Sequence, residues 1–225
     1  MSTKLSLERD FTRFLDDPTF PYKVTVCVGE RKVLCSGALL AQQSSVLERK
    51  LRDDNGVLMF EEMIDVVNSN EVIIQCIQYL HGADLQFKFE TIAVVLKFAS
   101  IYEVEDLFGK GLEWLQQHLE TSKSVGGAIE FLKMSNCLNT EYSAKVKSVI
   151  CRFISSNRDI FGLFGGDLLT TGITGEDMLL IINEKPVNSG NILKKWVESS
   201  TKNREFIVNN HSRIDFCFTK VYFTY

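Results

Sequence analysis

The sequence contains no run of about 18 uncharged apolar residues, so its pattern predicts no membrane-spanning helix. The residues up to Asp10 include charged side chains such as Lys4 and Glu8, which leave no apolar stretch of the length that a secretory signal needs. We therefore expect an intracellular protein, in the cytoplasm or the nucleus, that does not bind a membrane.

A basic block is missing too. The 25 lysines and arginines are outnumbered by 29 aspartates and glutamates, and the formal net charge is -4. Because proteins bind nucleic acids largely by neutralising phosphates with Lys and Arg, we expect no nucleic acid partner.

The patterns that support catalysis or metal binding are also lacking. Zinc sites commonly use cysteine pairs separated by two to four residues, but the closest cysteines here are Cys27 and Cys35. The glycine-rich segment Phe161–Asp167 has no lysine and no preceding βαβ pattern, so it does not indicate a phosphate-binding loop. None of the three histidines lies in a nucleophile motif, and we expect His81 to be a half-buried structural imidazole. No metal, cofactor or enzymatic activity is predicted.

The first half combines short strands with many helices. Tyr22–Val28 alternates and is followed by a turn and by Val33–Cys35, which predicts a hairpin, and Val57–Phe60 is a third strand candidate. Apolar residues at helical spacing then predict helices over Ala38–Ala41, Val46–Leu51, Val72–Leu80, Ile92–Ile101 and Val104–Leu119.

The second half carries helical patterns. A break is expected at Ser122–Gly127, because two glycines in sequence interrupt a helical pattern. Helices are predicted over Ala128–Leu138, Tyr142–Ser155 and Ile192–Ser200, and the terminal Ile214–Tyr225 alternates as a strand would.

An amphipathic helix is predicted at the start of the chain, over Leu5–Asp17. Nothing earlier in the chain can cover its apolar stripe, which leaves two readings: the stripe packs on its own domain, or a second subunit buries it. The stripe consists of Leu7, Phe11, Phe14 and Leu15.

Three segments of the first half follow one known pattern. The Val24–Leu34 hairpin leads into Ala38–Leu47, with its Ala-Leu-Leu-Ala and Ser-Ser sequences, and Ile77–Leu85 and Val95–Leu107 come next. In this order and spacing the segments resemble the BTB/POZ family. The resemblance implies a small three-stranded sheet with a helical cluster.

The second half resembles the BACK domain that follows BTB/POZ in kelch-type adaptors. Phe131–Cys137 is similar to its opening helix, and Val187–Glu198 to its helix with a buried tryptophan, here Trp196. The resemblance therefore implies an α+β fold in two domains. By this resemblance, residues 1–121 are expected to form a BTB/POZ domain with an N-terminal dimerisation helix, and residues 122–225 an all-helical BACK-like domain.

Several positions depart from the family pattern. Lys23 replaces an aspartate, and Ser36 and Gly37 replace a His-Arg pair, at positions that line the central pocket of the family's dimer. Asn55 and Val57 stand where cullin-binding members carry a hydrophobic residue and, two positions later, a glutamate. We therefore expect weaker recruitment of cullin-3 than the fold alone implies.

By resemblance, the chain is expected to be a homodimeric interaction scaffold, a substrate adaptor of a cullin-3 type ubiquitin ligase with an unknown client. The alternative is a cullin-independent assembly domain of a transcriptional or cytoskeletal scaffold. The expected dimer interface consists of Leu7, Phe11, Phe14, Leu15 and Val24. The expected partner surface consists of Leu51, Asp53, Asn55, Val57, Phe60, Tyr102 and Glu103.

Overall fold

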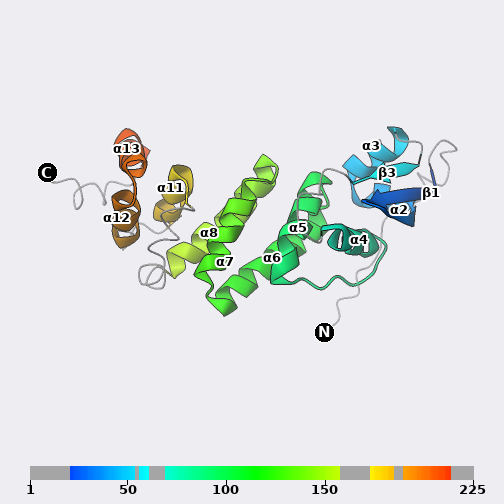
Figure 1. Ribbon diagram of the computed structural model, residues 1–225, viewed down its shortest axis with the longest axis horizontal. Helices are drawn as coiled ribbons and strands as arrows, with labels where there is room; N and C mark the ends of the chain where they lie inside the picture. The colour runs from blue at the N-terminus through cyan, green and yellow to red at the C-terminus, as the bar shows by residue number, and fades with distance from the viewer. Residues whose placement is uncertain (1–20, 54–55, 61–68, 158–172, 185–189, 214–225) are drawn as a thin grey trace. The chain divides into compact units, whose positions relative to one another are not determined.

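The computed structural model describes residues 21–53, 56–60, 69–157, 173–184 and 190–213 (Figure 1). Their elements are one three-stranded sheet and a larger set of helices, which is compatible with the predicted α+β class. The chain divides into two compact units, Met1–Gly111 and Leu112–Tyr225, so the division lies ahead of the predicted boundary after residue 121. The predicted helix Leu5–Asp17 and the predicted strand Ile214–Tyr225 lie outside the described residues.

The sheet of the first unit confirms the predicted hairpin and third strand. Strand β1 (Lys23–Val28) lies in the middle, antiparallel to β2 (Arg31–Ser36) and parallel to β3 (Val57–Met59). Between β1 and β2 the chain turns through Gly29, whose φ of 58° is a left-handed value that glycine adopts without strain. The alternate valines of β1 are buried, so one face of the sheet belongs to the core.

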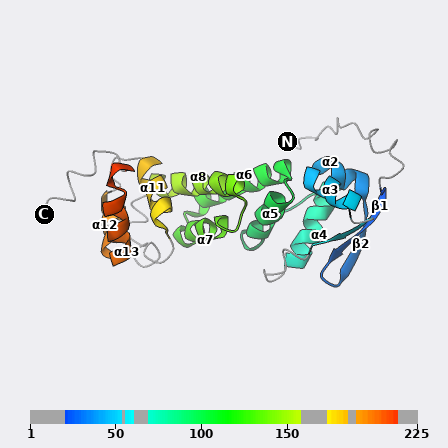
Figure 2. The same ribbon diagram turned by 90° about the horizontal axis from the view of Figure 1, so that it is seen from above.

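Helices cover that buried face. In the first unit, α2, α3 and α4 contact β2, β3 and β1 respectively, all from one side of the sheet (Figure 2). Helix α5 packs on α4, and α6 passes from the first unit into the second. The bounds are α2 (Gly37–Gln43), α3 (Ser45–Asp53), α4 (Ser69–Leu80), α5 (Phe89–Ile101) and α6 (Glu105–Ser122).

The described part of the second unit contains only helices, as the pattern predicted. They are α7 (Val125–Ser135), α8 (Thr140–Ser156), α11 (Gly175–Glu184), α12 (Gly190–Glu198), α13 (Thr201–Asn209) and a short 3-10 turn (His211–Arg213). Across both units, none of the described helices has the length and apolarity that crossing a bilayer requires.

The glycines of the expected Ser122–Gly127 break lie inside α7. The break itself lies within the expected range, at Lys123, whose φ is 52°, and Ser124 caps α7 by accepting a hydrogen bond from the Gly127 N–H at 3.1 Å. Gly126 and Gly127 lie in the first turn of α7, so the conformational freedom of these glycines does not interrupt the helix interior.

Helix α11, which the periodicity did not single out, is anchored by a buried carboxylate. Asp177 is 1% exposed, and Thr174 donates a 2.7 Å hydrogen bond to its Oδ2. The Lys147 ammonium from α8 lies 2.9 Å from Oδ1, as a charge contact and not an aligned hydrogen bond. A buried charge without a partner is costly, so this contact fixes α11 against α8.

Trp196 on α12 is buried, as expected for the tryptophan of this segment. Its side chain is 1% exposed, and its indole N–H donates a 3.1 Å hydrogen bond to the Ile173 carbonyl. The ring also meets Phe206 of α13 edge-on, at 6.3 Å between centroids. Trp196 therefore connects α12 both to the chain before α11 and to α13.

We predict that Trp196→Ala lowers the free energy of unfolding by about 3 to 5 kcal/mol, because it leaves a cavity and removes the partner of the Ile173 carbonyl. Leu180→Ala is the matched control, since Leu180 lies exposed on α11 and its loss should change stability by less than about 0.5 kcal/mol. Chemical denaturation of both variants checks this. Equal midpoints for the two would contradict the role given to Trp196.

Candidate interaction surface

An aromatic cluster supports the expected partner surface from below. Phe60 follows β3, while Phe98 lies on α5 and Tyr102 ends it. The Phe60 ring lies 5.8 Å from that of Phe98 and 4.8 Å from that of Tyr102, and the last two rings are 4.9 Å apart. All three side chains are buried. Such ring pairs add to the area that they bury, so the cluster holds the end of β3 against α5.

The two serines of the Ser-Ser sequence fix the turn after α5. The Ser44 hydroxyl donates to the Tyr102 carbonyl and accepts a 3.0 Å hydrogen bond from the Leu47 N–H, which caps α3. Ser45 donates a 3.1 Å hydrogen bond to the Glu103 carboxylate. The first turn of α3 and the Tyr102–Glu103 turn therefore share one hydrogen-bonded corner.

Glu103 has a backbone that glycine would adopt more easily. Its φ is 52°, in the left-handed region that costs a residue with a Cβ about 1 kcal/mol or more. Its side chain is exposed, so burial does not explain the choice of glutamate. Strained backbone clusters at functional sites, so Glu103 is a candidate for contact with a partner.

The predicted partner surface separates into an exposed and a buried set. Asp53, Val57 and Glu103 are exposed, and Val57 is 44% accessible. The side chains of Leu51, Phe60 and Tyr102 are buried, so they support the surface and do not reach a partner. Asn55 lies outside the described residues.

Of the residues predicted to form the dimer interface, only Val24 lies in the described part of the chain. Val24 is 1% exposed on the covered face of the sheet, and its strand has neighbours on both edges. Its side chain is therefore part of its own unit's core and not available to a second chain. Leu7, Phe11, Phe14 and Leu15 lie outside the described residues.

The departures at Ser36 and Gly37 have a structural reason. A Cβ on residue 37 would lie 2.1 Å from the Pro21 carbonyl oxygen, so only glycine fits there. The Ser36 hydroxyl caps α2 by accepting a 3.4 Å hydrogen bond from the Leu39 N–H. The Ser36 backbone N–H donates to His81 Nε2 at 3.1 Å, while His81 Nδ1 lies 2.8 Å from the Ile77 carbonyl. This pairing requires a neutral ring with the proton on Nδ1, and His81 is a half-buried structural imidazole, as expected.

The other face of the sheet is open, and of its apolar residues only Val57 belongs to the predicted partner surface. Register places Leu34 and Val57 on either side of Thr25, and Met59 beside Cys27. Leu34 is 70% exposed and Met59 is 54% exposed. We call the outward residues of β1, β2 and β3 the open face; its apolar or weakly polar members are Thr25, Cys27, Leu34, Val57 and Met59.

Tyr79, Asp106 and Lys110 form a polar network on the surface of the first unit. The pKa values of Tyr79 and Lys110 decide whether either can act as a general base. The Tyr79 hydroxyl donates to the Asp106 carboxylate and accepts from Lys110 Nζ at 2.6 Å. Burial and the bond to Asp106 raise the pKa of Tyr79. Burial alone would lower the pKa of Lys110, but hydrogen bonds to Tyr79 and Asp106 raise it overall. Both groups therefore keep their protons at neutral pH, which is the wrong state for a general base.

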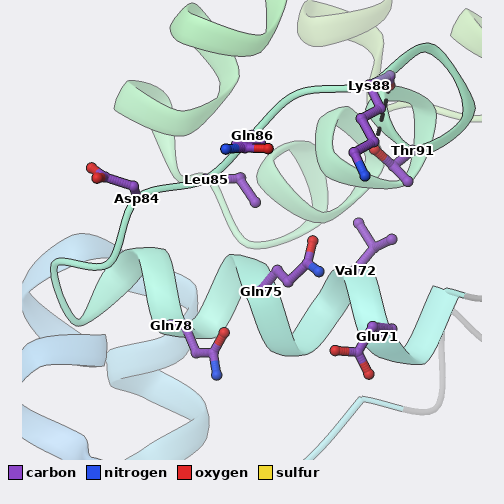
Figure 3. Close-up of a pocket in the computed structure, with 9 residues that line it drawn as sticks. All are labelled: Glu71, Val72, Gln75, Gln78, Asp84, Leu85, Gln86, Lys88 and Thr91. Carbon is purple, nitrogen blue, oxygen red and sulfur yellow. Dashed lines mark hydrogen bonds between the residues drawn. The ribbon is translucent and has the colours of Figure 1, made fainter.

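A polar groove lies between α4 and the segment that leads to α5 (Figure 3). Its volume is about 580 Å³. The lining is mainly amide and charged side chains from both walls, among them Gln75, Gln78, Asp84, Gln86 and Lys88. In the described part of the chain, no group of three or more His, Cys, Asp or Glu residues is placed to hold a metal ion.

Comparison with known proteins finds no matching family model and no matching curated protein.

We predict that Glu103→Gly is more stable than Glu103→Ala by about 1 kcal/mol. Both variants lose the hydrogen bond from Ser45, but only glycine relieves the left-handed backbone. Thermal or chemical denaturation of the pair isolates the strain, and two variants of equal stability would show that this turn relaxes without it.

Proposed function

We propose that this chain is a non-catalytic, homodimeric protein-interaction scaffold of the BTB-BACK type. The observation that carries the proposal is that Val57 and Glu103 are exposed beside the ends of β3 and α5, which the buried aromatic cluster packs together. Binding costs less when the contacting groups are already ordered, so a surface held in this way suits partner recognition.

The corner formed by Ser45 and Glu103 supports the same reading. An exposed carboxylate that is held by a hydroxyl of a neighbouring helix has a fixed position from which it can meet a donor on a partner. No proton needs to move for this function, in keeping with the raised pKa values of Tyr79 and Lys110.

The homodimer rests on the apolar stripe of Leu7, Phe11, Phe14 and Leu15. A two-fold interface can bury such a stripe against its own symmetry copy, and permanent interfaces of this kind are apolar in the manner of a divided core. Val24 is removed from the proposed interface because its own unit buries it.

The proposed scaffold can be of two types, a cullin-3 adaptor or a cullin-independent assembly domain, and the residue at position 57 bears on the choice. A cullin-3 adaptor follows from the resemblance to kelch-type proteins. The exposed Val57 stands where cullin-binding members carry glutamate, and it favours the alternative, a cullin-independent assembly domain.

We predict that the double variant Phe11→Asp and Phe14→Asp is a monomer in light scattering, while the unchanged chain is a dimer. Two charges on each copy of an apolar interface remove its driving force. Thr12→Asp is the charge control, since Thr12 lies outside the stripe. A double variant that keeps the dimer mass would exclude the N-terminal segment from the interface.

We predict that, if the dimer is a cullin-3 adaptor, it binds cullin-3 at micromolar concentration and Val57→Glu strengthens binding by restoring the family's carboxylate. Titration of purified cullin-3 by calorimetry measures this, with Val57→Gln as the uncharged control. An intact dimer that does not bind cullin-3 would reject the adaptor and leave the assembly domain.

A further inference from the structure

The open face is an apolar patch bordered by two lysines. On β1, Lys23 lies one outward position before Thr25, and on β2, Lys32 is paired with Cys27. The two lysines therefore lie at opposite ends of the patch, about 14 Å apart along the strand direction at the usual rise per residue.

Neither lysine has a counter-ion within the described residues. Among the residues that the structure describes, the side chains of Lys23 and Lys32 make no ion pair and no hydrogen bond. In contrast, Arg31, beside Lys32 but on the opposite side of β2, is paired with Glu71. The outward strand positions carry no acidic residue, and the closest acid along the chain is Glu30, in the turn. The open face is thus apolar in its centre and positive at its ends.

The dimensions of the face fit one helix. Three strands span about 10 Å between the outer backbones, which is close to the diameter of one helix with its side chains. A sheet that is apolar on a face normally buries it against a further layer, and the described helices of this unit cover only the other side.

We propose that the open face binds a single amphipathic helix of a partner protein, with acidic residues flanking its apolar stripe. The stripe packs on Leu34, Val57 and Met59, and the flanking carboxylates meet Lys23 and Lys32. The inference deepens the proposed scaffold function, because it gives the chemical class of the unknown client, and Val57 belongs to both surfaces.

The native thiol of Cys27 reports on occupancy. Cys27 is half-buried on the central strand of the face, between Lys32 and Met59, and Cys137 of the second unit is exposed and serves as an internal reference. The probe is a synthetic helical peptide with leucines at helical spacing and glutamates on both flanks. Its counterpart carries lysine in place of every glutamate.

The full-length protein is labelled with a maleimide, and modification of each cysteine is followed by mass spectrometry. At a concentration four times its dissociation constant, the acidic peptide should slow labelling of Cys27 about five-fold, because about four fifths of the sites are then occupied. Labelling of Cys137 should not change. The basic peptide should protect neither thiol, and added salt should weaken the protection.

Two variants test the chemistry of the face. Leu34→Asp should abolish protection without lowering the melting temperature, because this side chain is 70% exposed. The double variant Lys23→Glu and Lys32→Glu should reverse the preference, so that the basic peptide protects Cys27. Protection that persists in Leu34→Asp, or a preference that does not reverse, would overturn the proposal.

The labelling experiment gives a different result if the open face is covered by something other than a partner helix. Removal of residues 1–20 that speeds labelling of Cys27 several-fold, without any peptide, would show that the chain's own N-terminal segment covers the face and would overturn the inference. A monomeric wild-type protein whose Cys27 is still protected by the acidic peptide would remove the proposed homodimer but keep this site. A dimer without protection would remove this site alone.

Discussion

A three-stranded sheet has two faces, and the described helices of the first unit bury only one of them. Val24, Val26 and Val28 of β1 enter the core beneath α2, α3 and α4, and this burial fixes the register of both neighbouring strands. The same register turns Leu34 and Met59 outward. Burying apolar area is the main favourable term in folding, so the covered face stabilises the unit while the other face stays open for an interaction.

Polar contacts at the edges of the core then hold the ends of helices of the first unit in place. Ser44 connects the start of α3 to the end of α5, and His81 connects the end of α4 to the start of α2. In the second unit, Asp177 and Trp196 act similarly on α11 and α12. Each contact satisfies a buried or half-buried group whose loss would leave a partner without a hydrogen bond, so side chains exposed beside these contacts have defined positions.

Much of this fold follows from periodicity, because β1 alternates strictly and most helices carry long apolar stripes. Burial on particular faces was harder to predict. Val33, Leu34 and Cys35 are all apolar, and only pairing with β1 decides that Leu34 points outward. Phe60 and Tyr102 were assigned to a surface by resemblance, which does not reveal that their rings pack on each other. Thr174 and Asp177 form a capping pair that signals the start of α11, a local motif that apolar spacing does not detect.

The central claim, a sheet with one buried and one open face, is tested most directly by hydroxyl-radical footprinting of the wild-type protein. Met59 and Phe60 are neighbours in sequence, yet Met59 is 54% exposed and Phe60 is 2% exposed. The account predicts rapid oxidation of Met59 and protection of Phe60, Phe98 and Tyr102 in the same sample. Met59 protected as strongly as Phe98 would contradict it, because the face described as open would then be covered.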